Sequence, residues 1–447
     1  MVQAAVKRSA ETKQGFQGKD QPDRAIMQRC IRCGLCLPSC PTYLETYSES
    51  SSPRGRIHLI QSVADGVLSI TDPGFVEQMY QCLDCRACEA ACPSGVQYGQ
   101  LVETARSQIE RARRRPAWQR ATRTAAFRQL FGDMRRFRQS NALIRFYQRS
   151  GAQRLARRSG ALRVLRMNEL EALVPSLPDQ FVVPEGKVYP PEGTVIRGRV
   201  AVFAGCIMST VFAETDRATV RVLNASGYEV VVPEQQGCCG ALGIHAGEME
   251  DARGLARRNI AAFERSGAEA IIVNAAGCGS TLKEYGHLFE DDPEWSARAR
   301  AFSEQIRDVT EFLGDLLAQD KLNTTFQPLN ITVTFQEPCH LVHAQRISRQ
   351  PRALLKAIPG LTLVEMEESA VCCGSAGIYN LVRPQMARQL GDRKAKNAIA
   401  TDAQAVVTAN PGCHLQVRAS LERNGSPLPV IHIVDLLDAA YRGHMPV

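Results

Sequence analysis

Hydrophobic and polar positions divide the chain into two halves of different texture. From Arg199 onward, short runs rich in β-branched residues alternate with amphipathic segments, which predicts βαβ units around a parallel sheet. The strand-like runs are residues 200–205, 228–232, 270–277, 331–338, 361–367 and 405–412. Before Arg199, Ile57, Ile60 and Val63 recur at helical spacing and predict a helix. Five prolines within residues 167–198 predict a connection without regular secondary structure.

The six strand-like runs form two sets of three, and each run is followed by cysteine within a few residues. The first set precedes Cys206, Cys238–Cys239 and Cys278, and the second precedes Cys339, Cys372–Cys373 and Cys413. Corresponding cysteines lie 133 to 135 residues apart. Two copies of one α/β unit therefore follow one another along the chain.

Length and composition indicate several packed domains. The 447 residues exceed one ordinary core, and 44% hydrophobic with 22% charged residues is normal globular composition. We divide the chain into a polar tail (1–24), a cysteine-rich helical domain (25–110), an arginine-rich helical connector with a proline-rich linker (111–198), and two repeats (199–325 and 326–447). The expected fold class is a multidomain α plus α/β protein.

Two features bear on location. The longest apolar runs fall far short of the roughly 18 residues that a membrane span needs. The N-terminal residues lack the apolar core of an export signal. We therefore expect a cytoplasmic protein, whose sixteen cysteines serve metal binding or catalysis rather than disulfides.

Two cysteine runs near the N-terminus carry the most specific motif. They comprise Cys30, Cys33, Cys36 and Cys40 before Pro41, and Cys82, Cys85, Cys88 and Cys92 before Pro93. Both match C-x2-C-x2-C-x3-C-P, the bacterial ferredoxin signature, in which the fourth cysteine ligates the other of two clusters. We predict two 4Fe–4S clusters, one held by Cys30, Cys33, Cys36 and Cys92 and the other by Cys82, Cys85, Cys88 and Cys40.

A pair of four-cysteine zinc sites is the alternative, although zinc sites normally use two separated C-x2-C pairs. The two runs are 41 residues apart, and the helical pattern between them favours a helical ferredoxin-like domain, similar to that of succinate dehydrogenase iron–sulfur subunits, over a small β-sheet domain. Arg54 and Arg56 in this interval are either hydrogen-bond donors to cluster sulfurs or surface charges.

The cysteines of the two repeats form a second candidate set. Because the carboxyl ends of parallel strands share one sheet edge, we expect four thiols to converge in each repeat. Such thiols indicate further cluster ligands or a redox dithiol, whereas a lone cysteine is usually a small buried apolar residue. Four histidines near these loops are either additional ligands, proton carriers or ordinary hydrogen-bonded side chains, and they are His245, His340, His343 and His414.

Charge is concentrated between Arg111 and Arg166. This segment holds 17 arginines and one acidic residue, a local charge of +16, so the remainder of the +8 chain carries −8. Aromatic residues such as Trp118 and Phe137 are interleaved with the arginines. The segment is suited to docking on an acidic partner or on anionic lipid, or it is a connector whose arginines pair with the acidic body. A cluster or zinc protein that binds nucleic acid through these arginines is a third hypothesis. Because only the charge fits this hypothesis, we place it last and expect no nucleic-acid partner.

The repeats resemble the cysteine-rich CCG domain of heterodisulfide reductases. In that family such repeats carry a non-cubane 4Fe–4S cluster, and the pattern ends in C-x-x-C. Here Cys278 is followed by Thr281 and Cys413 by Gln416 where the family has its final cysteine. The missing cysteine in both repeats argues against a non-cubane cluster and against disulfide reduction by this chain.

The whole pattern resembles glycolate oxidase (glycolate dehydrogenase) iron–sulfur subunits. The resemblance is carried by CIRCGLCLPSCPTY, CLDCRACEAACPSGVQYG, GCCGALGIHAGE and VCCGSAGIYN. It implies an electron-transfer subunit without catalytic residues of its own, which passes electrons from glycolate-oxidising flavoprotein subunits toward a membrane acceptor such as quinone. Peripheral membrane association follows as an expectation. FAD is expected on the partners, because no Gly-rich dinucleotide loop is present. A subunit of a lactate-utilisation or heterodisulfide-reductase-like oxidoreductase is the alternative.

Overall fold

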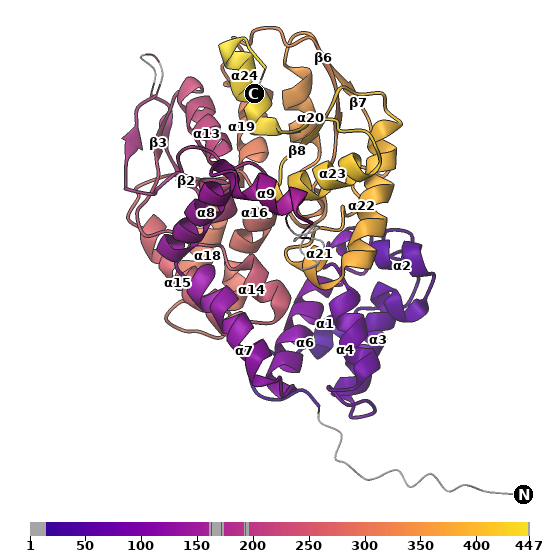
Figure 1. The fold of residues 1–447 in the computed structure, drawn as a ribbon. Coiled ribbons are helices and arrows are strands. Elements are labelled where there is room, and N and C mark those ends of the chain that lie inside the picture. Colours follow the sequence, from indigo (N-terminus) through magenta and orange to yellow (C-terminus); the bar gives the residue numbers. More distant parts are fainter. Residues whose placement is uncertain are drawn as a thin grey trace, which may run out of the picture.

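The computed structural model describes residues 15–160, 162, 171, 174–191, 193 and 196–445. Figure 1 shows the N-terminal helices below two α/β units that stand side by side, with the helical connector running over the first unit. Residues 1–14 of the polar tail and residues 163–170 of the connector lie outside the described residues. No helix in the described part of the chain has the length and apolar character needed to span a bilayer.

The cysteine-rich domain is helical, and its described residues contain no strand. Its helices are α1 (Arg24–Gln28), α2 (Pro41–Thr46), the 3-10 turn η1 (Glu49–Ser51), α3 (Pro53–Ala64), α4 (Pro73–Gln81), α5 (Ala87–Ala90) and α6 (Tyr98–Ala112). Proline begins α2, α3 and α4, where its missing N–H costs no helical hydrogen bond. Ile60, Phe75 and Leu101 are fully buried in its core. The predicted helical domain, including the helix through Ile57, is confirmed.

In its described residues the connector contains α7 (Ala117–Thr124), the π-helical turn η2 (Ala125–Leu130), α8 (Met134–Arg149) and α9 (Ala152–Arg158). Asp133 begins α8 by accepting hydrogen bonds from the amides of Arg135 and Arg136. The prediction of no regular element in the proline-rich linker is wrong at one place. Val188–Tyr189 forms strand β1, antiparallel to β3, because this β-branched and aromatic pair lies between prolines at the edge of a sheet.

The first repeat is a five-stranded sheet in the order β1-β3-β2-β4-β5. Its own strands are β2 (Gly198–Phe203), β3 (Tyr228–Val231), β4 (Ala270–Val273) and β5 (Ile306–Asp308), and they are parallel. Its helices are α12 (Ile207–Thr210), α13 (Ala213–Ala225), α14 (Ala241–Ala246), α15 (Met249–Phe263), α16 (Ala276–Lys283), α17 (Tyr285–Leu288), α18 (Ser296–Gln305) and α19 (Val309–Ala318).

The second repeat has four parallel strands in the order β7-β6-β8-β9, which reproduces the order of β3, β2, β4 and β5. The strands are β6 (Ile331–Phe335), β7 (Leu361–Val364), β8 (Ala405–Thr408) and β9 (Val430–His432). The remaining elements are the π-helical turn η3 (His340–Ala344), α20 (Arg349–Lys356), α21 (Tyr379–Val382), α22 (Pro384–Ile399), α23 (Pro411–Arg423) and α24 (Ile433–Arg442). The duplicated parallel architecture and all six predicted strands are confirmed.

The two repeats share one hydrophobic core rather than forming separate bodies. Helix α13 packs against α24 and α19 against α20, and the joint core includes Leu223 from the first repeat and Leu437 from the second. At the edge of this contact, Arg221 donates two hydrogen bonds to Asp438, at 2.8 and 2.7 Å. The relative positions of the two sets of cysteine loops are therefore fixed by packing.

Candidate metal centres

Two cavities in the N-terminal domain are lined by the eight predicted cysteine ligands. Thiols of the first are Cys30, Cys33, Cys36, Cys88 and Cys92, and those of the second are Cys40, Cys82, Cys85 and Cys88. Each cavity thus contains one complete predicted ligand set. Cys88 lines both cavities, so the two sites are immediate neighbours.

The same backbone conformation directs the thiols toward one centre in both runs. Arg32 and Gly34 have φ values of +57° and +87°, and Asp84 and Arg86, at equivalent positions of the second run, have +54° and +61°. These left-handed residues lie between successive cysteines and turn the chain tightly, so that thiols two residues apart face one centre. Strain at three non-glycine positions is maintained by the surrounding structure, a feature of ligand-binding loops.

Hydrogen-bond donors surround the thiols. The amide of Asp84 lies 3.3 Å from Cys82 Sγ, and the amide of Val96 lies 3.5 Å from Cys92 Sγ. Thr42 Oγ1 lies 3.3 Å from Cys40 Sγ and donates its own proton to the Ser51 carbonyl at 2.8 Å. Donors to sulfur stabilise thiolates over thiols and tune the potential of a bound cluster.

The spacing of the thiols distinguishes a cluster from a single zinc ion. With zinc–sulfur bonds of about 2.3 Å, four thiolates around one ion lie about 3.8 Å apart. Among the described residues, no three cysteine sulfurs lie within 4.8 Å of one another. The thiols therefore surround spaces wider than one ion, and the donor set fits iron–sulfur clusters better than mononuclear zinc.

Arg54 and Arg56 have different environments. Arg54 pairs with Glu49 at 2.7 Å near the surface. Arg56 is 1% exposed, lines the second cavity and donates to Thr42 Oγ1, which in turn contacts Cys40. Burial would lower the pKa of Arg56, yet the nearby Cys82 and other ionisable groups raise it above its usual value. Arg56 is therefore a buried cation beside the second site, and the surface-charge alternative is wrong for it.

The second site adjoins the second repeat. Leu83 and Cys85 form one apolar cluster with Cys372 and Tyr379, and Tyr379 donates to the carbonyl of Gln81 at 2.9 Å. Burial, reinforced by the neighbouring Cys339, raises the pKa of the Cys85 thiol well above its usual value. The thiols of the second repeat thus lie beside a predicted cluster.

In both repeats the cysteines converge at the carboxyl edge of the sheet, as the parallel topology predicts. Sulfur–sulfur distances are 3.7 Å for Cys206–Cys238, 3.2 Å for Cys239–Cys278 and 4.0 Å for Cys339–Cys372. Gly240 and Gly374 follow the cysteine pairs with φ of +86° and +87°. A Cβ at Gly374 would lie 2.6 Å from the carbonyl oxygen of Ala387, so that position requires glycine.

The surroundings of the two sets differ. Phe137 of α8 and Leu255 cover Cys206 and Cys238, so the connector packs against two of the four cysteines in the first set. The second set faces the N-terminal domain instead. Only the second set is therefore in contact with a predicted cluster site.

A buried cation also distinguishes the second repeat. Lys394 of α22 is 2% exposed and donates to the carbonyl of Ser369 at 3.1 Å. Burial lowers its pKa, while Cys373, Cys372 and Cys413 act to raise it. In the first repeat, Asn259 of α15 lies 135 residues earlier and donates to the carbonyl of Cys238 at 3.0 Å. A lysine next to thiols compensates negative charge that asparagine would not.

The four histidines form no hydrogen bond with a cysteine sulfur within the described chain. His245 contacts Asp84 at 3.1 Å. Burial would lower the pKa of His245, but this contact and a second one with Glu103 raise it to about 9. His340 Nε2 lies 2.9 Å from the carbonyl of Asp84, and His343 Nε2 3.0 Å from that of Ala370. His414 packs against the Phe212 ring.

His245 belongs to an ionic network that joins the N-terminal domain to the first repeat. At its centre is Arg86, which is 3% exposed and contacts Asp84 and Glu103 at 3.0 Å and Glu284 at 3.2 Å. A Cβ at Gly99 would lie 1.9 Å from the guanidinium carbon, so glycine at that position leaves room for Arg86. The three acids surround a cation that the protein itself supplies.

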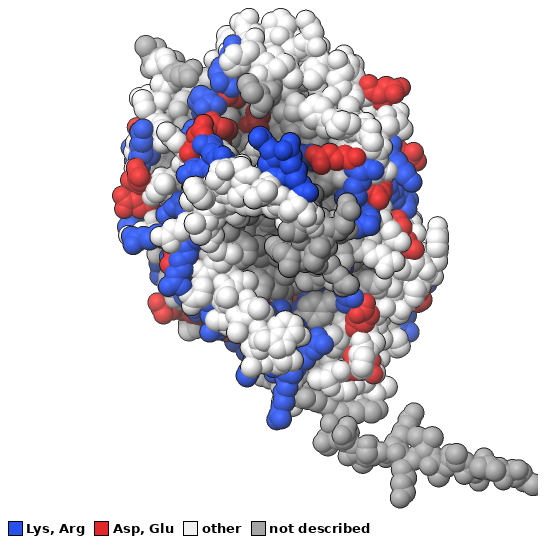
Figure 2. Space-filling model, in the orientation of Figure 1, with Lys and Arg blue, Asp and Glu red and all other residues white. Residues whose placement is uncertain are grey.

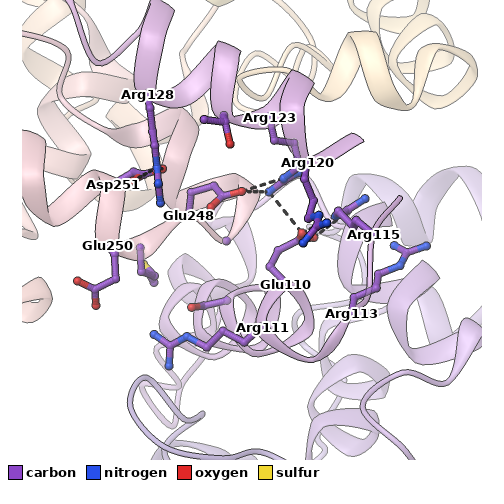
Figure 3. Close-up of a pocket in the computed structure, with 14 residues that line it drawn as sticks. Glu110, Arg111, Arg113, Arg115, Arg120, Arg123, Arg128, Glu248, Glu250 and Asp251 are labelled. Carbon is purple, nitrogen blue, oxygen red and sulfur yellow. Dashed lines mark hydrogen bonds and ion pairs between the residues drawn. The ribbon is translucent and has the colours of Figure 1, made fainter. Parts of the chain in front are cut away.

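The connector docks through part of its arginines. Figure 3 shows Arg123 between Glu110 and Glu248, and Arg128 beside Asp251. Other guanidinium groups of the described connector, including those of Arg113, Arg114 and Arg120, make no ion pair with the described residues. Figure 2 shows more basic than acidic side chains on the face that it presents. Pairing with the acidic body therefore accounts for only part of the excess charge.

Sequence patterns alone did not identify Arg56, Arg86 or Lys394 as buried groups near the sites. One signal for Lys394 was available. It shares a helical stripe with the buried Ala387, Leu390 and Ala398, which places it on the apolar face of α22.

Comparison with known proteins agrees with this geometry. The 4Fe-4S dicluster domain model matches residues 26–96, the cysteine-rich domain model matches residues 200–283 and 333–418, and the model of the glycolate oxidase iron-sulfur subunit linker region matches residues 118–174. The dicluster match supports iron–sulfur binding by the N-terminal domain.

Several curated relatives align along nearly the whole chain. The probable glycolate oxidase iron-sulfur subunit of Bacillus subtilis is 43% identical over 94% of this chain and 95% of its own length. The glycolate oxidase iron-sulfur subunit of Escherichia coli is 34% identical over 93% and 94%. One of the subunits of the fumarate reductase (CoM/CoB) of Methanothermobacter marburgensis is 29% identical over 96% and 75%. Its paired cluster motifs, linker and two cysteine-rich repeats, together with these identities, show that this chain belongs to the family of glycolate oxidase iron–sulfur subunits.

Proposed function

We propose that this chain relays electrons in a glycolate oxidase complex, from flavoprotein subunits that oxidise glycolate to glyoxylate toward a membrane acceptor such as quinone. The observation that carries the proposal is the pair of adjacent thiol-lined cavities, which together contain both complete predicted ligand sets. A 4Fe–4S cluster, when bound, accepts and releases one electron at a time, which suits a relay between two-electron partners.

The ligand sets follow the lining of the cavities. We assign Cys30, Cys33, Cys36 and Cys92 to one cluster and Cys82, Cys85, Cys88 and Cys40 to the other. The amides of Asp84 and Val96 would orient the thiolates, and Arg56 would balance the negative charge of the second site.

Placing the flavin on a partner is supported by the loops of the repeats. The loops at the carboxyl edge, where dinucleotide folds present a Gly-rich phosphate loop, present cysteines in this chain. We therefore assign substrate oxidation to the partner subunits and no catalytic residue to this chain.

The second repeat is the better candidate for an additional redox centre. In the set of Cys339, Cys372, Cys373 and Cys413, the first two adjoin the second cluster site and the last three the buried Lys394. In the set of Cys206, Cys238, Cys239 and Cys278, the first two are covered by the connector instead. Iron in clear excess of about eight atoms per chain would support occupation of the repeats.

Single ligand replacements test the relay. In the purified complex, Cys33→Ser or Cys85→Ser should abolish glycolate-dependent reduction of an acceptor downstream of the flavin and remove part of the cluster EPR signal. Ser39→Ala is the matched control, because its hydroxyl donates only to the Cys36 carbonyl at 3.0 Å. Unchanged electron flow in both cysteine variants would refute the relay.

Thiol chemistry in a heterodisulfide-reductase-like or lactate-utilisation system is the second candidate function. The 3.2 Å distance between Cys239 and Cys278 favours it, because two such thiols can exchange with a disulfide. Thiol–disulfide turnover by the chain without partners would support this candidate, and its absence alongside glycolate-driven electron flow would exclude it.

Peripheral association with the cytoplasmic face of a membrane completes the proposal. On α8, Leu143 and Phe146 are 71% and 70% exposed on the same surface as Arg135 and Arg149. Exposed apolar side chains beside arginines suit the interface of an anionic bilayer.

A further inference from the structure

A cleft of about 530 Å³ lies where the N-terminal domain, the connector and both repeats meet. Its wall includes Cys82 and Leu83 of the second cluster run, Arg113 of the connector, His245 of the first repeat and Val382 of the second. The volume is in the range of small-molecule sites, and convergence of several domains is typical of them. A ligand in this cleft would contact a residue assigned as a ligand of the second cluster.

One part of the cleft wall is apolar and aromatic. Tyr80 of α4 and Tyr379 of α21 line it together with Leu83, Ile109 and Ile378. The Tyr379 hydroxyl is bound to the Gln81 carbonyl, which holds that ring in place. Such walls accept a flat, uncharged ring by burying its faces.

The polar groups of the cleft are mainly cationic. Glu77 is neutralised by Arg383, with contacts of 2.7 and 2.6 Å. Arg113 has no side-chain partner among the described residues, and Figure 3 shows its guanidinium directed away from Glu110. A guanidinium beside the apolar part of the cleft is suited to a ligand oxygen that gains negative charge as the ligand is reduced.

We propose that this cleft binds the ring of a quinone, which accepts electrons from the second cluster site. The inference rests on the proposed relay function and names its acceptor site. Oxidation of glycolate to glyoxylate releases two electrons and two protons, and reduction of a quinone to the quinol consumes the same number. The electrons would arrive singly through the cluster sites, and the protons would be taken from solvent at the mouth of the cleft, where Val382 is 58% exposed.

Two matched pairs of variants test the site in the full, cluster-loaded chain. Val382→Trp narrows the mouth, whereas Leu381→Trp places the same side chain at the neighbouring residue, which is 50% exposed and does not line the cleft. Arg113→Gln removes the cation, whereas Arg114→Gln removes an adjacent exposed arginine outside the cleft.

Binding of heptyl-hydroxyquinoline N-oxide, followed by its fluorescence, gives a readout that is independent of turnover. We expect one saturable site, weakened about tenfold or more by Val382→Trp and about tenfold by Arg113→Gln, the usual effect of losing one charge-assisted hydrogen bond. Leu381→Trp and Arg114→Gln should bind as the parent chain does. Equal affinity in all four variants, or no binding, would overturn the proposal.

Turnover separates failure of the site from failure of the relay. In the glycolate-driven complex, the ratio of menadione reduction to dye reduction should fall about tenfold in Arg113→Gln and keep its parent value in Arg114→Gln. If dye is reduced and this ratio does not change, the relay stands and the quinone site is refuted. If the parent complex reduces neither acceptor while inhibitor binding follows the cleft variants, the relay fails and the cleft is a binding site without that role.

Discussion

Replacing Arg86 by methionine tests the junction between the second cluster run and the first repeat. The guanidinium is buried and contacts Asp84, Glu103 and Glu284 at 3.0 to 3.2 Å. Methionine keeps much of the apolar volume and removes the charge. Asp84 and Glu103, both buried, would then keep only the His245 imidazolium as a neighbouring cation.

The expected loss of stability is several kcal/mol. At an effective dielectric constant of about 20, each contact near 3 Å is worth about 5 kcal/mol before the cost of burying the charges is subtracted. Measured losses on removing one partner of a buried ionic network are about 3–5 kcal/mol. The Glu284 contact adds little, because that side chain is 37% exposed. A loss of this size lowers the melting temperature by roughly 6–20 °C in a domain of this scale.

Thermal unfolding of the metal-free chain, followed by circular dichroism, measures the effect without cluster loss. The control is Asp65→Asn, which removes the charge of an exposed pair with Arg24 and should cost about 0–1 kcal/mol. Gly99→Ala should also destabilise the chain, because its methyl group would displace the Arg86 guanidinium. If Arg86→Met melts within about 2 °C of Asp65→Asn, the network contributes no net stability and the reasoning is refuted.

Three further predictions concern other parts of the chain. Burial and the nearby Asp438 raise the pKa of Asp435 to about 7, although the hydrogen bond from Thr215 opposes this shift. Between about pH 4 and 7 the native state therefore holds a proton that the unfolded chain has released, and the free energy of unfolding falls as the pH rises. Asp435→Asn should reduce this fall and be more stable than the parent in urea unfolding at about pH 8; an unchanged pH slope would contradict the assignment. Lys394→Asn should remove iron bound in excess of about eight atoms per chain while sparing the N-terminal clusters, and retention of the excess would show that the cation is not needed. The double variant Leu143→Gln, Phe146→Gln should co-sediment several-fold less with anionic phospholipid vesicles than the parent; equal binding would place the membrane contact elsewhere.

Much of the architecture could be predicted because it depends on local pattern. Strands β2, β4 and β8 are continuous apolar runs buried on both faces, which a parallel sheet requires. Once these strands are parallel, the cysteines that follow them must share one edge. Strands β5 and β9 were missed because three residues each are too few to show a period.

The buried charges could not be predicted, because their partners are distant in sequence. Arg86 is 198 residues from Glu284, and the motif that contains it gives no sign of that contact. Arg56 appeared to be as exposed as Arg54, although helix α3 turns it into the second cavity. Burial of such a group depends on tertiary partners rather than on local propensity.

The central claim is that the N-terminal thiols hold two neighbouring 4Fe–4S clusters that conduct single electrons. Iron and acid-labile sulfide analysis, with EPR spectra of the dithionite-reduced, anaerobically purified full chain, tests it most directly. We predict at least about eight irons and eight sulfides per chain, with signals broadened by interaction between two adjacent clusters. A chain that contains zinc, with neither iron nor sulfide, would contradict the account.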